Sequence, residues 1–308
     1  MGSIAGVVVR RALSGVLTIF LLVTFVFFMM RVVGDPVASL APEDATQEQI
    51  DALRVRLGLD GPLIVQYRDY LLGILEGDLG RSYRSNRPAV ALVLERLPAT
   101  LELAAVALGL AVLVAIPVGV IAAVRPGSLI DAFSRVFAVL GQSLPVFWLA
   151  ILLIIVFAVN LGWFPSTGRG GIEHLVLPGL ALSVYSIPLT MRLTRSALME
   201  ELGKDYIRTG RAKGLREWEV VAKHGLRNSM IPVITVLALR VGTVITGAII
   251  LEEVFAYPGL GRLGVQALQT ADFPVIQAFI VFIAAVTVSI NLIVDILYTV
   301  VDPRVRLT

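Results

Sequence analysis

The sequence predicts an all-α membrane protein with six transmembrane helices. Hydrophobic residues make up 57% of its 308 residues and charged residues only 16%, whereas soluble domains average roughly 45–50% apolar and about 25% charged residues. A helix needs about 20 apolar residues to cross the hydrocarbon core of a bilayer. Six stretches approach or reach that length: 12–30, 104–124, 137–160, 175–191, 231–251 and 275–294.

The first stretch, 12–30, follows Arg10 and Arg11 as a secretory signal would. We interpret it as a retained span, because its apolar run exceeds the roughly 7–15 residues of a signal peptide and no small-residue cleavage site follows it. The fourth stretch is the shortest and contains Pro178 and Pro188. Neighbouring helices can satisfy the carbonyl groups that proline leaves free, so this span is expected inside a bundle.

Two helices are predicted in the long loop 31–96. Thr46 and Gln49 form a possible capping box before an apolar helical pattern that stops at Gly58. Pro62 can occupy the first position of a second helix, in which apolar and aromatic residues recur at helical spacing. This second helix can lie on the membrane surface or pack over the outer ends of the bundle.

The basic residues predict the orientation of the chain, because Lys and Arg in short loops remain on the cytoplasmic side. With the N-terminus inside, fifteen Lys and Arg residues lie in inner segments, nine of them in 192–230. The short outer loops then contain two, Arg169 and Arg262. We therefore expect a multi-pass protein of the inner membrane with both termini in the cytoplasm.

No catalytic, metal or cofactor site is predicted. The chain has no cysteine, and its two histidines, His174 and His224, fall on opposite sides of the predicted membrane. No G-x-x-x-x-G-K-[ST] motif is present, so ATP cannot be bound through a P-loop of this chain. Residues 259–264 match G-x-G-x-x-G, but no strand precedes them and we treat the match as chance. We predict that the chain is not an enzyme, and its net charge of +3 gives no indication of nucleic acid.

Arg240 is the one ionisable residue expected deep in a span, near the middle of 231–251. A guanidinium at that depth is costly, so it should face a polar cavity or a partner. Ion-coupled carriers usually place carboxylates deep in the bundle, and the two halves show neither an obvious inverted repeat nor paired broken helices. A secondary carrier remains an alternative, but a chain with these features is expected to obtain energy from a partner.

The inner segment 205–230 is the most polar periodic stretch between two spans. Its pattern predicts a polar helix containing Arg208 and Arg211, a sharp change of direction at Gly214, and a short helix over 217–226. Trp218, Val221 and Leu226 are the expected contact groups of that helix. Such an element can fit the groove of a soluble partner, or its basic residues can bind anionic lipid.

This segment resembles the EAA loop of ABC importer permeases, whose consensus is E-A-A-x3-G-x9-I-x-L-P. Gly214 matches the glycine and Leu226 the leucine. Five residues depart from the consensus: Arg208, Thr209, Gly210, His224 and Arg227. These departures resemble the dipeptide, oligopeptide, nickel and glutathione branch, where R-T-A-R-A-K-G-L and H-x-L-R-N are usual, with Gly210 as the one difference in the first run.

The resemblance extends over almost the whole chain and is to the first permease of that branch. Similar motifs occupy 34–36, 57–60, 77–80, 97–103, 143–148, 253–262, 295–298 and 302–304. It implies the type I ABC importer permease fold. The implied divisions are an N-terminal segment with the first helix (1–30), an extracytoplasmic loop region (31–96), a five-helix core with the inner coupling loop 192–230 (97–302), and a cytoplasmic tail (303–308).

The resemblance also implies partners and site residues. The partners are a homologous second permease subunit, two ATPase subunits that hold ATP and Mg, an extracytoplasmic solute-binding protein and membrane lipid. The cargo is expected to be di- or oligopeptides, with nickel, glutathione or a small oligosaccharide as alternatives. The expected ATPase-coupling residues are Arg208, Thr209, Arg211, Ala212, Lys213, Gly214, Leu215, Glu217, Trp218, Val221, His224 and Leu226. The expected translocation-pathway residues are Arg240, Glu253 and Asn291.

Overall fold

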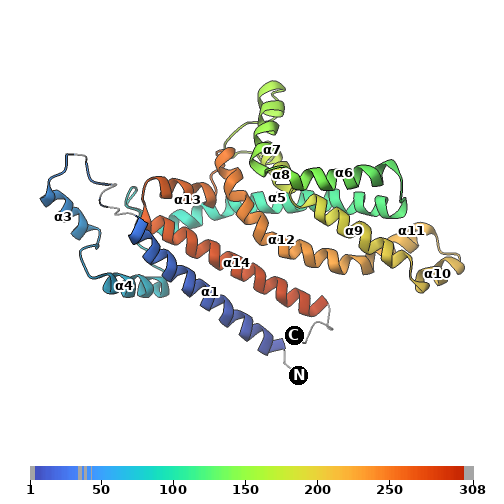
Figure 1. Cartoon of the computed structure of the whole chain (residues 1–308), viewed down its shortest axis with the longest axis horizontal. Coiled ribbons are helices and arrows are strands. Elements are labelled where there is room, and N and C mark those ends of the chain that lie inside the picture. The colour runs from blue at the N-terminus through green and yellow to red at the C-terminus, as the bar shows by residue number, and fades with distance from the viewer. Residues whose placement is uncertain (1–3, 34–36, 38–39, 43, 302–308) are drawn as a thin grey trace. The chain divides into compact units, whose positions relative to one another are not determined.

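The computed structural model describes residues 4–33, 37, 40–42 and 44–301, and in these residues all regular secondary structure is helical (Figure 1). The motifs at 34–36 and 302–304 and the tail 303–308 lie outside the described residues. The helices are α1 (Ile4–Val33), α3 (Gln47–Arg56), α4 (Leu63–Glu76), α5 (Ala89–Val124), α6 (Leu129–Ser143), α7 (Val146–Leu153), α8 (Glu173–Ser183), α9 (Ile187–Leu202), α10 (Asp205–Ala212), α11 (Glu217–Glu219), α12 (Arg227–Val254), α13 (Leu260–Gln269) and α14 (Phe273–Val301). Two π-helical segments, η1 (Ile154–Asn160) and η2 (Val220–Leu226), follow α7 and α11.

Four helical runs among the described residues are long and apolar enough to cross a membrane unbroken: those within α1, α5 and α14, and the run from α11 to α12. Two further pairs pass the same test but bend, by 105° between α6 and α7 and by 59° between α8 and α9. Counting each bent pair as one span gives six. Neither bend was predicted from the sequence, in which no paired broken helices were obvious. Pro145 caps α7 and Pro188 lies in the first turn of α9, where a missing N–H is tolerated but a continuous helix is not.

The described chain divides into two compact units, which we treat separately. Unit 1 contains residues 100–257 and 290–301, and unit 2 contains residues 4–99 and 258–289. In unit 2, the predicted capping box is confirmed. The Gln49 amide donates to Thr46 Oγ1 at 3.4 Å, and the Thr46 amide donates to Gln49 Oε1 at 2.9 Å. Helix α3 stops before Gly58, whose φ of +67° a residue with a side chain rarely adopts.

The second predicted loop helix, α4, packs against α1 within unit 2. Tyr67 and Thr24 share a hydrogen bond of 2.6 Å between their hydroxyl groups. The Arg31 guanidinium donates twice to Gln66 Oε1 at 3.1 Å and lies 3.4 Å from the centre of the Phe27 ring. Helix α4 is thus held to the first span by side-chain contacts, and both predicted alternatives, a position on the membrane surface and packing over the outer ends of the bundle, stay predictions.

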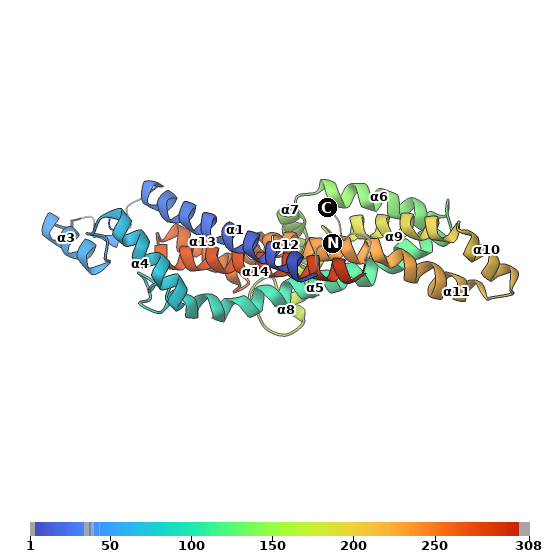
Figure 2. The same cartoon turned by 90° about the horizontal axis from the view of Figure 1, so that it is seen from below.

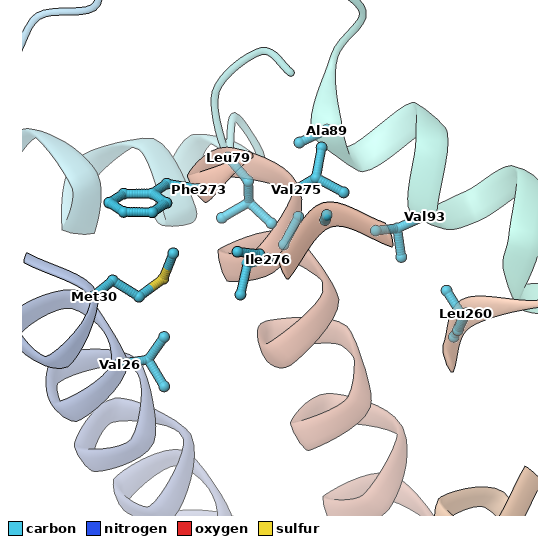
Figure 3. Packing of buried hydrophobic residues seen from close by; sticks show 11 residues of the cluster. Val26, Met30, Leu79, Ala89, Val93, Leu260, Phe273, Val275 and Ile276 are labelled. Carbon is cyan, nitrogen blue, oxygen red and sulfur yellow. The ribbon is translucent and has the colours of Figure 1, made fainter. Parts of the chain in front are cut away.

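The core of unit 2 is formed by α1, the start of α5, α13, α14 and the segment before α5 (Figure 3). Met30, Leu79, Val93, Leu260 and Ile276 are among its buried residues. Within a membrane, such side chains hold helices together mainly by van der Waals packing, because lipid tails are as apolar as the side chains themselves. The apolar cluster therefore joins the loop region to the adjoining ends of three long helices, α1, α5 and α14.

In unit 1, α9 packs against both α6 and α12, and the three helices run side by side in two views (Figures 1 and 2). Ala111 and Ala115 of α5 are fully buried in this bundle. A Cβ atom at Gly119 would lie 2.8 Å from the Met191 carbonyl oxygen and from Thr194 Cβ. Glycine at 119 therefore allows the backbones of α5 and α9 to approach closely.

The predicted fourth span is the pair α8 and α9. Leu177, Pro178 and Leu182 of α8 are buried among the described residues. The expectation that a proline-containing span is enclosed by its neighbours is confirmed. Helix α9 extends beyond the predicted end at 191, as far as Leu202, and carries the chain to the inner loop.

Candidate functional site

The inner loop begins with the predicted polar helix and turn, and Figures 1 and 2 both place α10 and α11 at the adjoining ends of α9 and α12. Gly214 forms the turn with φ of +79°. A Cβ atom added there would meet nothing within 4 Å. The requirement for glycine is therefore conformational, because the left-handed region disfavours residues with a side chain.

The second part of the loop differs from the prediction of a separate short helix. Helix α11 continues through η2 into α12, because Leu226 and Arg227 both have right-handed helical geometry and no turn residue separates them. The segment 217–226 is thus the N-terminal extension of the fifth span. A displacement of this segment acts directly on that span.

An ion pair closes the turn. Arg211 donates to Glu217 through Nη2 at 2.7 Å and through Nε at 3.1 Å, so the two residues form a two-point contact across Gly214. An exposed ion pair contributes little stability, but this contact restricts the geometry of the loop tip.

The predicted coupling residues divide by exposure. Residues 211–218 are all exposed, as are Arg208 and Thr209, and Trp218 has 63% of its surface exposed. His224 and Leu226 are partly buried. Val221 is only 9% exposed and packs against Ala123 and Leu198. Trp218 is therefore available to a partner, whereas Val221 fixes the loop to the bundle.

A groove of about 420 Å³ lies beside Trp218 and runs along the end of α5. Its lining residues are Val120, Ile121, Val124, Arg125, Ile130, Glu217, Trp218 and Val221. Most of these side chains are apolar. The loop and the end of α5 thus present one mainly apolar surface that contains one basic residue, Arg125, and one acidic residue, Glu217.

Sequence reasoning missed a buried ion pair close to this region. Asp131 is 1% exposed and accepts hydrogen bonds from Arg195 Nε at 2.6 Å, Arg195 Nη2 at 3.2 Å and the Gly127 amide at 2.9 Å. Arg135 lies 3.7 Å from the same carboxylate. The pair joins the first turn of α6 to α9. An aspartate at the start of an apolar helix is the sequence signal that could have indicated it.

Arg240 contacts an aromatic ring, as a partly buried residue of α12. Its guanidinium carbon lies 5.4 Å from the centre of the Tyr185 ring, within the range of a cation–π interaction. Tyr185 lies between α8 and α9, where the fourth span bends. No carboxylate in the described part of the chain forms an ion pair with Arg240.

The three predicted pathway residues do not form one cluster. Arg240 and Glu253 are thirteen residues apart on α12, or about 20 Å at 1.5 Å per residue. Glu253 and Asn291 are exposed. Glu252, the residue before Glu253, is buried instead, and its carboxylate accepts a 2.6 Å hydrogen bond from Thr100 Oγ1. The rotation of α12 about its axis determines which of the two glutamate side chains is buried. The sequence composition does not show that rotation.

A second polar cluster lies at the other end of unit 1. Glu102 Oε2 accepts hydrogen bonds from Arg169 at 2.7 and 3.1 Å and from the Tyr257 hydroxyl at 3.1 Å. Burial raises the pKa of Tyr257 to about 12, so its hydroxyl remains a donor. These contacts join the segment between η1 and α8 to α5 and to the segment after α12.

The fold and these sites define a membrane-embedded transporter component with an exposed, structured inner loop. Residues 115–307 match the family described as binding-protein-dependent transport system inner membrane component, and residues 4–104 match its N-terminal membrane component family. The chain belongs to this family. It is an integral inner-membrane permease component of an ABC importer, a class that works with an ATPase and a substrate-binding protein.

Three relatives illustrate the match. The chain is 40% identical to a putative peptide transport system permease protein of Brucella abortus (strain 2308), over 97% of this chain and 98% of the relative. It is 39% identical to the dipeptide transport system permease protein DppB of Escherichia coli (strain K12), over 92% and 93%. It is 41% identical to the glutathione transport system permease protein GsiC of Escherichia coli O6:H1, over 97% and 98%.

Solved structures show the same fold at lower sequence identity. Chains of the MetNI methionine ABC transporter in inward facing conformations match with TM-scores of 0.54 and 0.56 at 21% identity, over 68% of this chain and 96% of theirs. A chain from an amino acid ABC transporter with histidines matches with a TM-score of 0.54 at 14% identity, over 68% and 93%. The predicted fold class and family are confirmed.

Proposed function

We propose that the chain is one of two homologous permease subunits of an ATP-driven importer for short peptides, and that it is coupled to a separate ATPase through the loop 205–230. The structured loop tip is the observation that supports coupling most directly. The tip contains the turn at Gly214, the ion pair between Arg211 and Glu217, and the exposed Trp218. Trp218 lies on a helical segment that continues into a span. Closure of the two ATPase subunits would pull such loops together.

The names of the relatives support the substrate class. The three relatives described above are named for peptide, dipeptide and glutathione transport. These cargoes share a peptide backbone and at least one carboxylate. Arg240 would line the pathway and attract such a carboxylate through charge-assisted hydrogen bonds, with Glu253 and Asn291 as further pathway residues.

The remaining parts of the proposal concern the partners. Because the sequence contains no P-loop motif, ATP and Mg would be held by two ATPase subunits, and an extracytoplasmic solute-binding protein would select the cargo. The excess of Lys and Arg in the inner segments supports cytoplasmic termini and a cytoplasmic loop. The loop tip would then face the ATPase.

The test is transport by a reconstituted complex. The chain, its second permease subunit, the ATPase and the solute-binding protein are placed in liposomes, and uptake of a radiolabelled dipeptide is measured with ATP. Glutathione, Ni²⁺ and a small oligosaccharide serve as competitors. ATP-dependent dipeptide uptake is expected. Uptake driven by a proton gradient without the ATPase would contradict the mechanism, and transport of Ni²⁺ or oligosaccharide alone would contradict the substrate class.

A further inference from the structure

The hydroxyl group of Tyr206 lies where three segments of the inner region meet. Tyr206 is the second residue of α10. Its hydroxyl donates to Glu201 Oε2 at 2.5 Å, in the last turn of α9. It also accepts a hydrogen bond from Asn228 Nδ2 at 3.0 Å, in the first turn of α12. One phenol group therefore joins the helix before the loop to the helix after it.

The contacts around Tyr206 are chemically complementary. Burial raises the pKa of the Tyr206 hydroxyl, so the group remains protonated and can donate to the Glu201 carboxylate. Glu201 also pairs with Lys204, and its side chain is only 14% exposed. Hydrogen bonds to an ionised group are roughly twice as strong as neutral ones. Tyr206 itself is 40% exposed, so the charged acceptor and the two simultaneous hydrogen bonds, and not deep burial, favour this arrangement.

Side-chain contacts hold the loop together at two places, its base and its tip. At the base, Tyr206 connects α9, α10 and α12, and the neighbouring Ile207 is 1% exposed. At the tip, Arg211 and Glu217 connect the two sides of the turn. A loop closed at both positions keeps its shape when its tip is displaced, so the displacement reaches both flanking helices.

We infer that Tyr206 is a positioning residue for coupling: its hydroxyl holds the base of the 205–226 loop so that α9 and α12 move together when the ATPase moves the tip. The inference rests on the proposed coupling role of this loop. It assigns to Tyr206 a function in transmission and none in contact with ATP or cargo. Without the hydroxyl, the tip can move while one flanking helix stays behind.

Tyr206→Phe tests this assignment, because it removes one oxygen atom and keeps the ring. In this variant Glu201 keeps its ion pair with Lys204, and the exposed Asn228 side chain can bind water instead of the hydroxyl. Folding and assembly should therefore persist. The measured quantity is the number of ATP molecules hydrolysed per dipeptide imported by the reconstituted complex. A hydrogen bond to a charged group at a partly exposed site predicts a rise of about three- to tenfold in this ratio.

Two further variants provide controls. Tyr67→Phe removes the same phenol oxygen from the 2.6 Å hydrogen bond with Thr24 in unit 2, outside the loop, and should leave the ratio unchanged. Asn228→Ala should raise the ratio, and the double variant with Tyr206→Phe should raise it by less than the two single effects combined, because both remove the same contact.

The outcomes are distinguishable. The inference is overturned if Tyr206→Phe leaves the number of ATP molecules hydrolysed per dipeptide unchanged. This includes the case in which uptake and hydrolysis fall together, because a merely structural role lowers both rates equally. A change at Gly214 that uncouples transport, beside a normal Tyr206→Phe, would overturn the inference and leave the proposed coupling loop in place. If neither change alters the ratio, the coupling role of the loop itself is wrong.

Discussion

The conformation of Gly214 leads to a graded prediction for substitutions at the loop tip. Its φ is +79°, and an added Cβ atom would meet nothing within 4 Å, so any cost comes from the backbone alone. A left-handed conformation costs a residue with a side chain about 1–2 kcal/mol, and β-branched valine is a stronger outlier there. A change of 1–2 kcal/mol shifts an equilibrium by a factor of about 5–30.

Gly214→Val should therefore remove the turn from most molecules and misplace Trp218 and its neighbours. Gly214→Ala should have an intermediate effect, and Gly214→Asn a small one, because asparagine tolerates this region. The assay is dipeptide uptake and ATP hydrolysis by the reconstituted complex, with co-purification of all subunits as the check on assembly. Uptake should be reduced least in Gly214→Asn, more in Gly214→Ala and most in Gly214→Val. The amount of the protein in the membrane should not change.

Gly203→Ala is the matched control. Gly203 has φ of −82°, and the new Cβ atom would lie 3.4 Å from the Glu200 carbonyl oxygen, an ordinary van der Waals contact. This variant should transport normally. If Gly214→Asn and Gly214→Val were equally impaired, the conformational argument would be refuted. Normal ATP-driven uptake by Gly214→Val would refute the coupling role of the loop.

Three further predictions concern the pathway, the inner ion pair and the orientation. Arg240→Gln should give an assembled complex with reduced uptake of anionic peptides and little change for neutral ones; poor assembly would instead show a structural role, and full uptake of every peptide would exclude both. Arg195→Met leaves the 1% exposed Asp131 with only Arg135 at 3.7 Å and the Gly127 amide at 2.9 Å, so it should destabilise the protein by less than the about 3–5 kcal/mol of a fully unpaired buried charge, measured as earlier thermal unfolding in detergent, and the double variant with Asp131→Asn should recover part of this loss. A cysteine at Ser85 should react with an impermeant reagent in intact cells and one at Lys213 only after the membrane is opened, and the reverse pattern would overturn the predicted orientation.

The features that the sequence predicted well are local. The capping box at Thr46, the turn at Gly214 and the six apolar stretches each depend on residues a few positions apart, where backbone preference and hydrophobic length dominate. Even the bends have local signals, since Pro145 and Pro188 lie at or next to them. Their angles, however, depend on packing and could not be predicted.

The features that sequence reasoning missed depend on pairs distant in the chain. Asp131 and Arg195 are 64 residues apart, and Thr100 and Glu252 are 152 apart. No pattern within one helix indicates such partners. The choice between Glu252 and Glu253 requires the rotation of α12 about its axis, and a helix of weak amphipathicity does not reveal that rotation.

Two ion pairs of unit 1, Glu102–Arg169 and Asp131–Arg195, differ in how readily they can break. Glu102 and Arg169 have side chains that are 38% and 40% exposed, so their ion pair contributes about 0–1 kcal/mol and water can replace it. Asp131 is buried, and separating it from Arg195 would leave its carboxylate with only Arg135 and the Gly127 amide, so this pair costs more to break than the exposed one. A movement that enters at the inner loop therefore reaches α6 through α9 with this ion pair intact. It can separate the 161–172 segment from α5 at far lower cost. We expect conformational change in unit 1 to loosen the Glu102 cluster first and to carry α6, α9 and the loop as one body.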